Sequence, residues 1–227
     1  MADLKRSSAL SAPIDALSDS SGAMKAVIFD LGNVLVDFNH KLAAEKISGF
    51  SDRTPQQIFD LFFDSELTGL FEEGHITPED FFLKIKKQLG LSLDYEGFVP
   101  IYNGIFFLTE KNHSVYNLTR VLKDHYKIAL LSNINVLHFD YLKKNFSHLF
   151  DAFHYIVTSY ELGLRKPHPL IYQKTLEILA VSPQQVFYTD DRPELIRGAQ
   201  ELGIRSFVFK NIQQLKKDLL STGISIN

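Results

Sequence analysis

The fold is decided by KAVIFD, residues 25–30, a run that is short, apolar and β-branched and that ends in an aspartate. Such a run is typical of a strand buried on both faces. Comparable runs occur later in the chain, at residues 127–132, 152–159, 185–189 and 205–209. Helical patterns separate them, at residues 136–146, 169–180, 193–202 and 212–220. This alternation predicts an α/β fold, a doubly wound parallel sheet covered by helices on both faces.

The alternation is interrupted between residues 41 and 104, where no strand pattern occurs. This segment is rich in Phe and Leu, and it has helical periodicity at residues 56–63, 78–89 and 95–105. We therefore predict a small helical cap domain at residues 41–104, inserted into a core made of residues 24–40 and 105–227. Parallel α/β sheets bind ligands beyond the carboxyl ends of their strands, so the insertion is expected to cover the ligand site.

Composition limits the possible functions. Of the 227 residues, 45% are hydrophobic and 22% are charged, which allows a buried core and excludes global disorder. The formal charge of −3 gives no electrostatic footprint for nucleic acid or for an anionic membrane. The chain has no cysteine, which excludes disulfides, thiolate metal sites and cysteine nucleophiles. The lack of cysteine fits a cytoplasmic protein, and we expect that location.

Residues 1–23 are predicted to be a poorly ordered leader. They are rich in Ser and Ala, and Asp15 and Asp19 interrupt any apolar segment of the signal-peptide type. Met24 directly precedes the first predicted strand, which makes it a candidate alternative start or expression junction. No apolar run approaches the roughly 20 residues that span a bilayer, so we expect no membrane association.

Four polar groups stand at or just after the ends of predicted strands or strand-loops, namely Asp30, Ser132, Lys166 and the pair Asp190–Asp191. Each of them alone has a structural explanation, such as a turn residue or a solvated loop side chain. All four together, in order and each after its own strand or loop, are improbable as a coincidence. We therefore predict that they converge at one edge of the sheet.

This set of groups supplies what phosphoryl transfer requires. A carboxylate can act as a nucleophile and form a covalent intermediate, which divides one difficult step into two. Acidic oxygens and a backbone carbonyl suit Mg²⁺, a hard cation. A lysine and a hydroxyl can bind the remaining phosphate oxygens and offset developing charge.

From residue 24 onward, the sequence resembles the haloacid dehalogenase-like (HAD) superfamily. KAVIFDLGNVLVD resembles the first motif of this family, which implies that Asp30 is the nucleophile and that Asp30 and the Gly32 carbonyl bind the metal. LLSN resembles the second motif, which implies that Ser132 and Asn133 bind the phosphate. LGLRKPHPLIY resembles the third motif, which implies that Lys166 binds substrate and stabilises charge.

VFYTDDRPELIRGAQELGI resembles the fourth HAD motif, which implies that Asp190 and Asp191 bind Mg²⁺. The resemblance further implies a Rossmann-like core, and FEEGHITPEDFF resembles a cap helix of the family. It is greatest to a subgroup whose first motif reads Asp-Leu-Gly-Asn-Val and which includes an α-glucose-1-phosphate phosphatase. The implied function is a Mg²⁺-dependent phosphatase that hydrolyses a small phosphomonoester, such as a sugar phosphate, through an aspartyl-phosphate intermediate.

One position departs from the family pattern. The wider family usually has a second aspartate two residues after the nucleophile, where this chain has Gly32. A positioned general acid is typically worth about 100- to 10,000-fold in rate, so its loss needs an explanation. Either the leaving group departs with little protonation, or another residue or a water replaces the acid, or the site has lost hydrolysis. Asp37 and His75 are the candidate replacements.

Two alternative functions therefore stay open. The first is a catalytically silent binding module with the HAD fold. The second is a 2-haloacid dehalogenase, because such enzymes also lack the second aspartate. The pair Asp190–Asp191 disfavours a dehalogenase, because it offers a metal site that dehalogenation does not need. The expected partner is a small phosphorylated metabolite, and the sequence does not define the oligomeric state.

Overall fold

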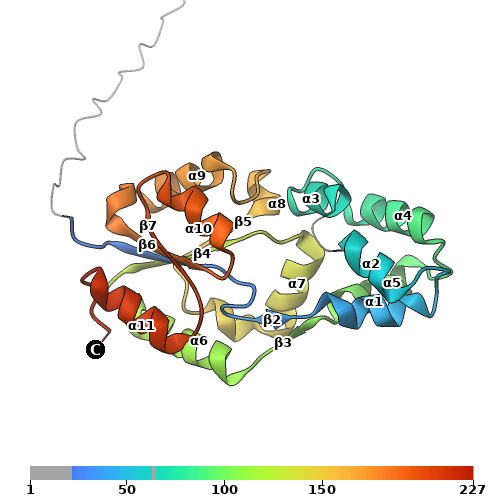
Figure 1. Cartoon of the computed structure of the whole chain (residues 1–227), viewed down its shortest axis with the longest axis horizontal. Coiled ribbons are helices and arrows are strands. Elements are labelled where there is room, and N and C mark those ends of the chain that lie inside the picture. The colour runs from blue at the N-terminus through green and yellow to red at the C-terminus, as the bar shows by residue number, and fades with distance from the viewer. Residues whose placement is uncertain (1–21, 63–64, 227) are drawn as a thin grey trace, which may run out of the picture.

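The computed structural model describes residues 22–62 and 65–226. Its centre is a five-stranded sheet with the strand order β5-β4-β1-β6-β7 (Figure 1). The strands are β1 (Ala26–Phe29), β4 (Lys127–Ser132), β5 (Tyr155–Thr158), β6 (Val186–Asp190) and β7 (Arg205–Val208). All their pairings are parallel, so their carboxyl ends lie at the same edge of the sheet. The predicted α/β, Rossmann-like doubly wound fold is confirmed.

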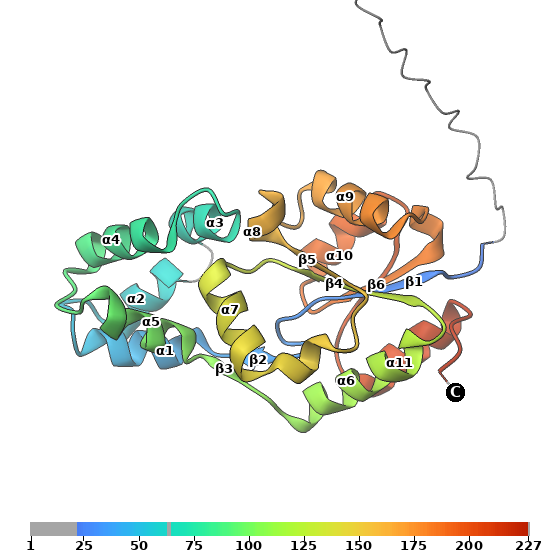
Figure 2. The same ribbon diagram turned by 180° about the vertical axis from the view of Figure 1, so that it is seen from behind.

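The central strand β1 is buried on both faces of the sheet. Val27 and Phe29 pack into one hydrophobic cluster, and Ala26 and Ile28 pack into another, as the two-residue period of a strand requires. The first cluster is covered by α6 (Glu110–Lys123), α7 (Val136–Asn145) and α11 (Ile212–Ser221). The second is covered by α9 (Pro169–Leu179) and α10 (Pro193–Gln200). Figures 1 and 2 show α6 and α11 on one side of the sheet and α9 and α10 on the other.

A separate group of helices lies beyond the carboxyl end of β1 (Figure 1). Its members are α1 (His40–Ser48), α2 (Pro55–Phe62), α3 (Glu66–Glu72), α4 (Pro78–Leu89) and α5 (Tyr95–Asn103). They share a third hydrophobic cluster of their own, rich in aromatic rings. Within it, Phe71 stacks on Phe81 at 4.3 Å and Phe98 stacks on Tyr102 at 5.2 Å between ring centroids. Most phenylalanines of this segment therefore pack its interior.

Two short strands form a ribbon where the chain passes between the sheet and the helical group. β2 (Asp37–Phe38) pairs antiparallel with β3 (Phe106–Phe107). The chain enters α1 directly after β2 and leaves α5 shortly before β3, so both connections run side by side (Figure 2). The β2–β3 ribbon thus brings Phe38 and Phe106 close to the carboxyl end of β1.

All the predicted strands and helices are present, with differences at their ends, whereas α1, α3, α6, α8, β2 and β3 were not predicted. The predicted strand at 152–159 is shorter, because Ser159 already begins the short helix α8 (Ser159–Leu162). Gln185, predicted to begin a strand, lies in a 3₁₀ helix at Pro183–Gln185, and a further 3₁₀ helix spans Ser147–Phe150. Of the predicted leader, residues 1–21 lie outside the described part of the chain. Within the described part, no helix combines the length and the apolar character that crossing a bilayer requires.

Candidate active site

Asp30 stands at the carboxyl end of the central strand. Its backbone N–H donates to Thr189 O at 3.0 Å, which continues the pairing of β1 with β6. The chain then turns sharply, since Asn33 has a φ of +56° and its N–H donates to Val36 O at 2.7 Å. Asparagine tolerates this left-handed conformation. The turn holds Gly32 and Asn33 beside the Asp30 carboxyl.

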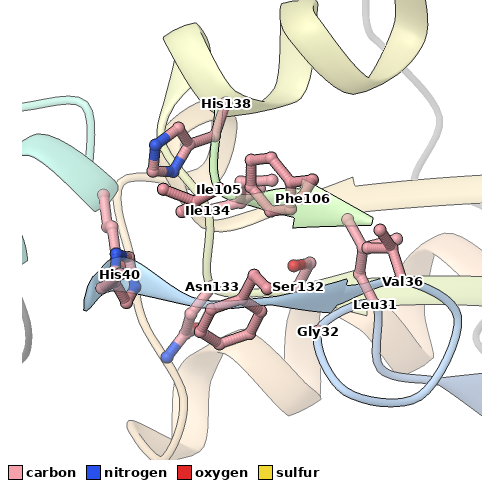
Figure 3. Close-up of a pocket in the computed structure, with 12 residues that line it drawn as sticks. Leu31, Gly32, Val36, His40, Ile105, Phe106, Ser132, Asn133, Ile134 and His138 are labelled. Carbon is pink, nitrogen blue, oxygen red and sulfur yellow. The ribbon is translucent and has the colours of Figure 1, made fainter. Parts of the chain in front are cut away.

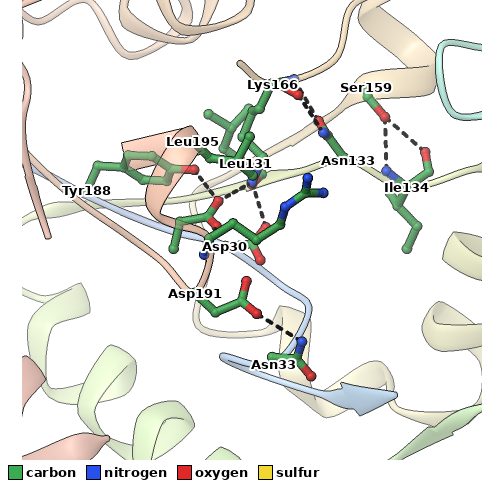
Figure 4. A network of polar contacts seen from close by, with 12 residues as sticks. Asp30, Asn33, Leu131, Asn133, Ile134, Ser159, Lys166, Tyr188, Asp191 and Leu195 are labelled. Carbon is green, nitrogen blue, oxygen red and sulfur yellow. Dashed lines mark hydrogen bonds and ion pairs between the residues drawn. The ribbon is translucent and has the colours of Figure 1, made fainter. Parts of the chain in front are cut away.

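Lys166 joins two carboxylates in the interior. Its Nζ donates to Asp30 Oδ1 at 2.7 Å, to Asp190 Oδ2 at 2.6 Å and to Leu131 O at 2.9 Å (Figure 4). The Lys166 side chain is 1% exposed. Burial alone would lower its pKa, but Asp190 and Asp30 outweigh burial and raise the pKa. The ammonium therefore stays charged, and its three donors are all used.

Asn133 positions Lys166 through the backbone. The Asn133 Oδ1 accepts from Lys166 N at 2.8 Å, and the Asn133 Nδ2 donates to Lys166 O at 2.9 Å (Figure 4). Asn133 follows β4 directly, so this paired contact fixes the loop that carries Lys166 to the end of β4. The Asn133 amide is thus occupied with the protein backbone.

Three carboxylates meet at the ends of β1 and β6. Asp30, Asp190 and Asp191 each offer an oxygen atom, and these atoms lie within 4.8 Å of one another. Asp190 is fully buried and accepts from Tyr188 Oη and from the Arg192 N–H, the latter at 2.9 Å. Asp191 Oδ2 accepts from Asn33 Nδ2 at 2.9 Å (Figure 4). The turn after β1 is thereby tied to the turn after β6.

This crowding of acidic groups changes their protonation. Burial, opposed by Lys166 and supported by Asp190 and Asp191, raises the pKa of Asp30 to about 7. Burial also raises the pKa of Asp191, against the hydrogen bond from Asn33. Tyr188 is buried beside Asp190, and burial together with that charge raises its pKa, so its hydroxyl stays protonated and donates. The single buried ammonium of Lys166 does not neutralise three carboxylates. A cluster of carboxylate oxygens is the set of ligands that a hard divalent cation prefers.

A cavity of about 340 Å³ opens directly above these groups. Asp30, Ser132 and Lys166 line it from the sheet, and Phe62 and Thr68 line it from the helical group. The site is therefore enclosed between the sheet edge and the helices that were predicted to cover it. A volume of this size fits a small ligand.

A smaller pocket of about 70 Å³ adjoins the first one (Figure 3). Both contain Gly32, Phe38, His40, Ser132 and Asn133 in their walls. The rest of the smaller pocket is mainly apolar. Figure 3 shows side chains from the ribbon and from the start of α7 closing it, with His40 and His138 on one side. The space beside the acidic cluster therefore has one polar and one apolar flank.

Two ion pairs face the larger cavity. Arg165 Nε lies 2.8 Å from Glu72 Oε2, which joins the loop before Lys166 to α3 of the helical group. Arg192 Nε donates to Glu194 Oε1 at 2.7 Å beside the acidic cluster. These charged groups line the cavity together with Asp30 and Lys166, so its wall carries both signs of charge.

Comparison with known proteins assigns the family. The sequence model of the haloacid dehalogenase-like hydrolases matches residues 24–203, most of the chain. The chain belongs to the haloacid dehalogenase-like hydrolases. The predicted membership is thereby confirmed, and the residues that carried it are the ones that meet around Asp30.

Similar proteins of this hydrolase family include two phosphatases. D-ribitol-5-phosphate phosphatase from Bacteroides thetaiotaomicron is 25% identical over 201 residues, covering 86% of this chain and 97% of that protein. Glyceraldehyde 3-phosphate phosphatase from Pyrococcus furiosus is 25% identical over 207 residues, covering 86% and 85%. A similar solved structure is a HAD family enzyme from B. thetaiotaomicron in complex with magnesium and inorganic phosphate. It has a TM-score of 0.71 and 26% identity, and the match covers 83% of this chain and 95% of that one.

The HAD motif residues meet as the sequence predicted, but the two candidate replacement acids do not join them. Asp37 accepts from Thr109 Oγ1, Lys111 Nζ and Asn112 Nδ2 at the start of α6, outside the cavity lining. His75 is half exposed beside Glu73 and also lies outside that lining. Neither side chain therefore lies in the cavity above Asp30, where a replacement acid would have to be.

Sequence reasoning missed several residues of this HAD site. Tyr188 could have been found, because it stands two residues before Asp190 on the same strand and so points to the same face. Asn33 could also have been found, because asparagine favours turns and this one follows Asp30 closely in the first motif. Phe38, His40 and Glu72 reach the cavity from the ribbon and the helical group, and their positions depend on packing that no local pattern reveals.

Proposed function

We propose that this HAD hydrolase is a Mg²⁺-dependent phosphatase that cleaves a small phosphomonoester through a covalent intermediate on Asp30. The observation that carries the proposal is the buried arrangement in which Lys166 bridges Asp30 and Asp190, next to Asp191 and below a ligand-sized cavity. A structural ion pair needs neither the third carboxylate nor the cavity. The relatives that act on phosphorylated small molecules support the same reaction.

Each residue has a chemical role in this proposal. Asp30 attacks phosphorus with a carboxylate oxygen, and the phosphoryl group passes to that oxygen while the leaving oxygen departs. The Lys166 ammonium stays fixed beside Asp30 and stabilises the negative charge of the transferring group. The Ser132 hydroxyl lines the cavity and offers a hydrogen bond to the phosphoryl oxygens. Asn133 acts through Lys166, whose backbone it holds.

Asp30, Asp190, Asp191 and the Gly32 carbonyl are the groups that we propose to hold Mg²⁺. The excess of carboxylates over ammonium groups fits a divalent cation better than a neutral or anionic occupant. When bound, Mg²⁺ offsets the repulsion between the Asp30 carboxylate and an anionic phosphate. We also infer that residues 41–104 form a cap, since α1–α5 have their own core and Thr68 and Glu72 of α3 reach the cavity. The cap then limits the substrate to a small molecule, such as a sugar phosphate.

The proposal is tested by replacing the nucleophile. Asp30→Asn keeps the shape of the side chain but removes its negative charge, so phosphate release from 4-nitrophenyl phosphate with Mg²⁺ is expected to fall on the order of 10⁴-fold or more. Chelation of Mg²⁺ is expected to stop the wild-type reaction as well. The matched control is Asp140→Asn, an exposed aspartate on α7, which is expected to leave the rate unchanged.

Three results would contradict the proposal. Full activity of Asp30→Asn would remove Asp30 from the nucleophile position. Halide release from a 2-haloacid that is insensitive to chelation would indicate a dehalogenase. Tight binding of phosphate or of phosphorylated ligands, without turnover across a broad panel of phosphate esters, would indicate a silent binding module.

A further inference from the structure

We propose that this site acts on phosphates whose leaving oxygen is acidic, because the part of the chain that the structure describes places no proton donor beside Asp30 for the leaving oxygen. The leaving oxygen would belong to a phenol, an enol, a hemiacetal or a carboxylic acid rather than to a simple alcohol. The inference rests on the proposed phosphatase function and narrows its substrate class. It is carried by the packing around Gly32 and by the ionisable groups that line the cavity.

An aromatic ring closes the space beside Gly32. A Cβ atom built on Gly32 would lie 2.7 Å from Phe38 Cε1 and 3.4 Å from Phe38 Cδ1. A contact of 2.7 Å is too short for two carbon atoms. No side chain, and in particular no carboxyl, fits at position 32 while the Phe38 ring stays where it is. The neighbour of Asp30 on this side is therefore the edge of an aromatic ring.

The Phe38 ring is held in place by the ribbon. Phe38 pairs with Phe106 across β2 and β3, and the two rings meet edge to face with centroids 6.3 Å apart. The His40 ring contacts Phe38 edge to face at 5.1 Å. The end of a flexible side chain could move aside at little cost in free energy. A ring that is packed on two sides cannot. The close approach of Phe38 to Gly32 is thus built into the fold.

The ionisable groups that line the described cavity do not replace the missing acid. Burial lowers the pKa of His40 to about 4, so its imidazole is neutral near pH 7 and has no proton to give readily. Glu72 Oε2 lies 2.8 Å from Arg165 Nε, so this carboxyl is paired with a guanidinium. Hydrogen bonds from its own backbone and from Arg192 lower the pKa of Glu194, so that carboxylate is ionised.

The remaining charged groups of the cavity lining have other roles. Asp30 and Asp191 belong to the proposed cation site. The three N–H groups of the Lys166 ammonium donate to Asp30, Asp190 and Leu131 O. Guanidinium groups do not lose a proton in proteins. Among the described residues around the cavity, none is therefore placed to protonate the leaving oxygen.

The proton balance of the reaction follows from this arrangement. An Asp30 oxygen forms a bond to phosphorus while the bond from phosphorus to the leaving oxygen breaks, and that oxygen keeps the electron pair. It departs as an anion and takes its proton from water afterwards. A water molecule then attacks phosphorus, frees the Asp30 carboxylate and gives its extra proton to the phosphate. The first step is fast only when the departing anion is stable by itself, because a positioned acid would otherwise supply about 100- to 10,000-fold.

The wild-type protein can be tested with substrates that share one aromatic ring. The series consists of 4-nitrophenyl, phenyl and benzyl phosphate with Mg²⁺; the last has a similar ring but an alkyl leaving oxygen. The ratio kcat/KM reports the steps up to the cleavage of the bond to the leaving oxygen. We expect kcat/KM to fall along the series and to be at least about 100-fold lower for benzyl than for 4-nitrophenyl phosphate. A value for benzyl phosphate within tenfold of that for 4-nitrophenyl phosphate would overturn the inference.

A pair of variants tests the same point from the side of the protein. Phe38→Ala removes the ring, and the double variant Gly32→Asp with Phe38→Ala places a carboxyl in the freed space. Compared with Phe38→Ala alone, the double variant is expected to raise kcat/KM at least tenfold for benzyl phosphate and much less for 4-nitrophenyl phosphate. An equal change for both substrates would overturn the inference. The wild-type series decides the question even if a variant does not fold.

The two proposals fail in different ways. If the wild type releases no phosphate from 4-nitrophenyl phosphate or acetyl phosphate, both of which have acidic leaving groups, the phosphatase function itself is wrong. If turnover occurs but does not depend on the leaving group, the phosphatase function stands and only the inference about the missing proton donor is wrong. The inference also distinguishes this chain from relatives named for 5- or 3-phosphates of small polyols or aldehydes.

Discussion

Lys166 sets the electrostatic balance of the site at the scale of single residues. Its ammonium is the positive partner of both Asp30 and Asp190, and the three side chains are at most 10% exposed. Removing one partner of a buried pair leaves an uncompensated charge, and such a loss typically costs about 3–5 kcal/mol. Lys166 is therefore needed for stability as well as for the proposed chemistry.

This role of Lys166 predicts the effect of Lys166→Met, a change that keeps the length of the side chain. Without Mg²⁺, the free energy of unfolding is expected to fall by about 3–5 kcal/mol, as measured by urea denaturation at pH 8. The matched control is Lys111→Met, which removes a pair with Asp37 and a hydrogen bond to Asn33 O; the Lys111 side chain is 33% exposed. Its loss is expected to stay near 1 kcal/mol. Equal losses in both variants would contradict the special position of Lys166.

At the scale of elements, α7 connects the site to the helical group. Just after Asn133, Asn135 caps the N-terminus of α7 and His138 lies in its first turn, and both contact Tyr102 of α5. The His138 and Tyr102 rings stack with centroids 4.3 Å apart. His138 Nε2–H donates to Tyr102 O at 3.3 Å, and Asn135 Nδ2 donates to His138 Nδ1 at 3.1 Å. Both ring nitrogens are thus satisfied in the neutral imidazole, and a second ring proton would meet a donor.

This contact predicts a pH dependence of stability. Burial lowers the pKa of His138 to about 3, below the value near 6.5 in the unfolded chain. Between these two values, the unfolded state binds more protons than the folded state, so the free energy of unfolding falls as the pH falls from about 6.5 to about 3. His138→Gln removes the titration, so its unfolding free energy is expected to depend less on pH in this range. Identical pH profiles, measured by urea denaturation, would contradict this assignment.

At the scale of the whole molecule, the helical group contacts α8, which follows β5 of the sheet, through close backbone contacts. Gly74, just after α3, has a φ of +67°, and a Cβ there would lie 2.4 Å from Tyr160 O of α8. Ser159 Oγ also donates to Glu72 O at 2.6 Å. These contacts hold the helical group over the cavity. The helical group can cover the cavity in this way only because position 74 has no side chain.

Two alanine variants separate closure from backbone strain. Gly74→Ala and Gly90→Ala both place alanine at a left-handed φ, which costs roughly 1 kcal/mol in each case. A Cβ at Gly90 would meet nothing within 4 Å, whereas a Cβ at Gly74 would collide with the backbone of Tyr160. We expect Gly74→Ala to lose more stability than Gly90→Ala, because its Cβ would collide with Tyr160 O, and only Gly74→Ala to raise KM for 4-nitrophenyl phosphate. A similar KM change in both variants would contradict a role of this contact in closure.

The sequence predicted the sheet and the convergence of Asp30, Ser132, Lys166 and Asp190, because these depend on local patterns and on the rule that parallel strand ends share an edge. It did not predict α6, whose apolar residues Val115, Leu118 and Leu122 form a narrow stripe in a polar segment. It also could not place Phe38 against Gly32. That contact joins two residues through the pairing of β2 with β3, and strands of two residues leave almost no pattern in a sequence.

The β2–β3 ribbon links the helical group to the nucleophile. The aromatic ring that excludes a side chain from position 32 belongs to β2, and the chain enters the helical group after β2 and leaves it before β3. The placement of the helical group and the space beside Asp30 thus depend on the same pair of strands. A substitution that disturbs the pairing of β2 with β3 would alter both together.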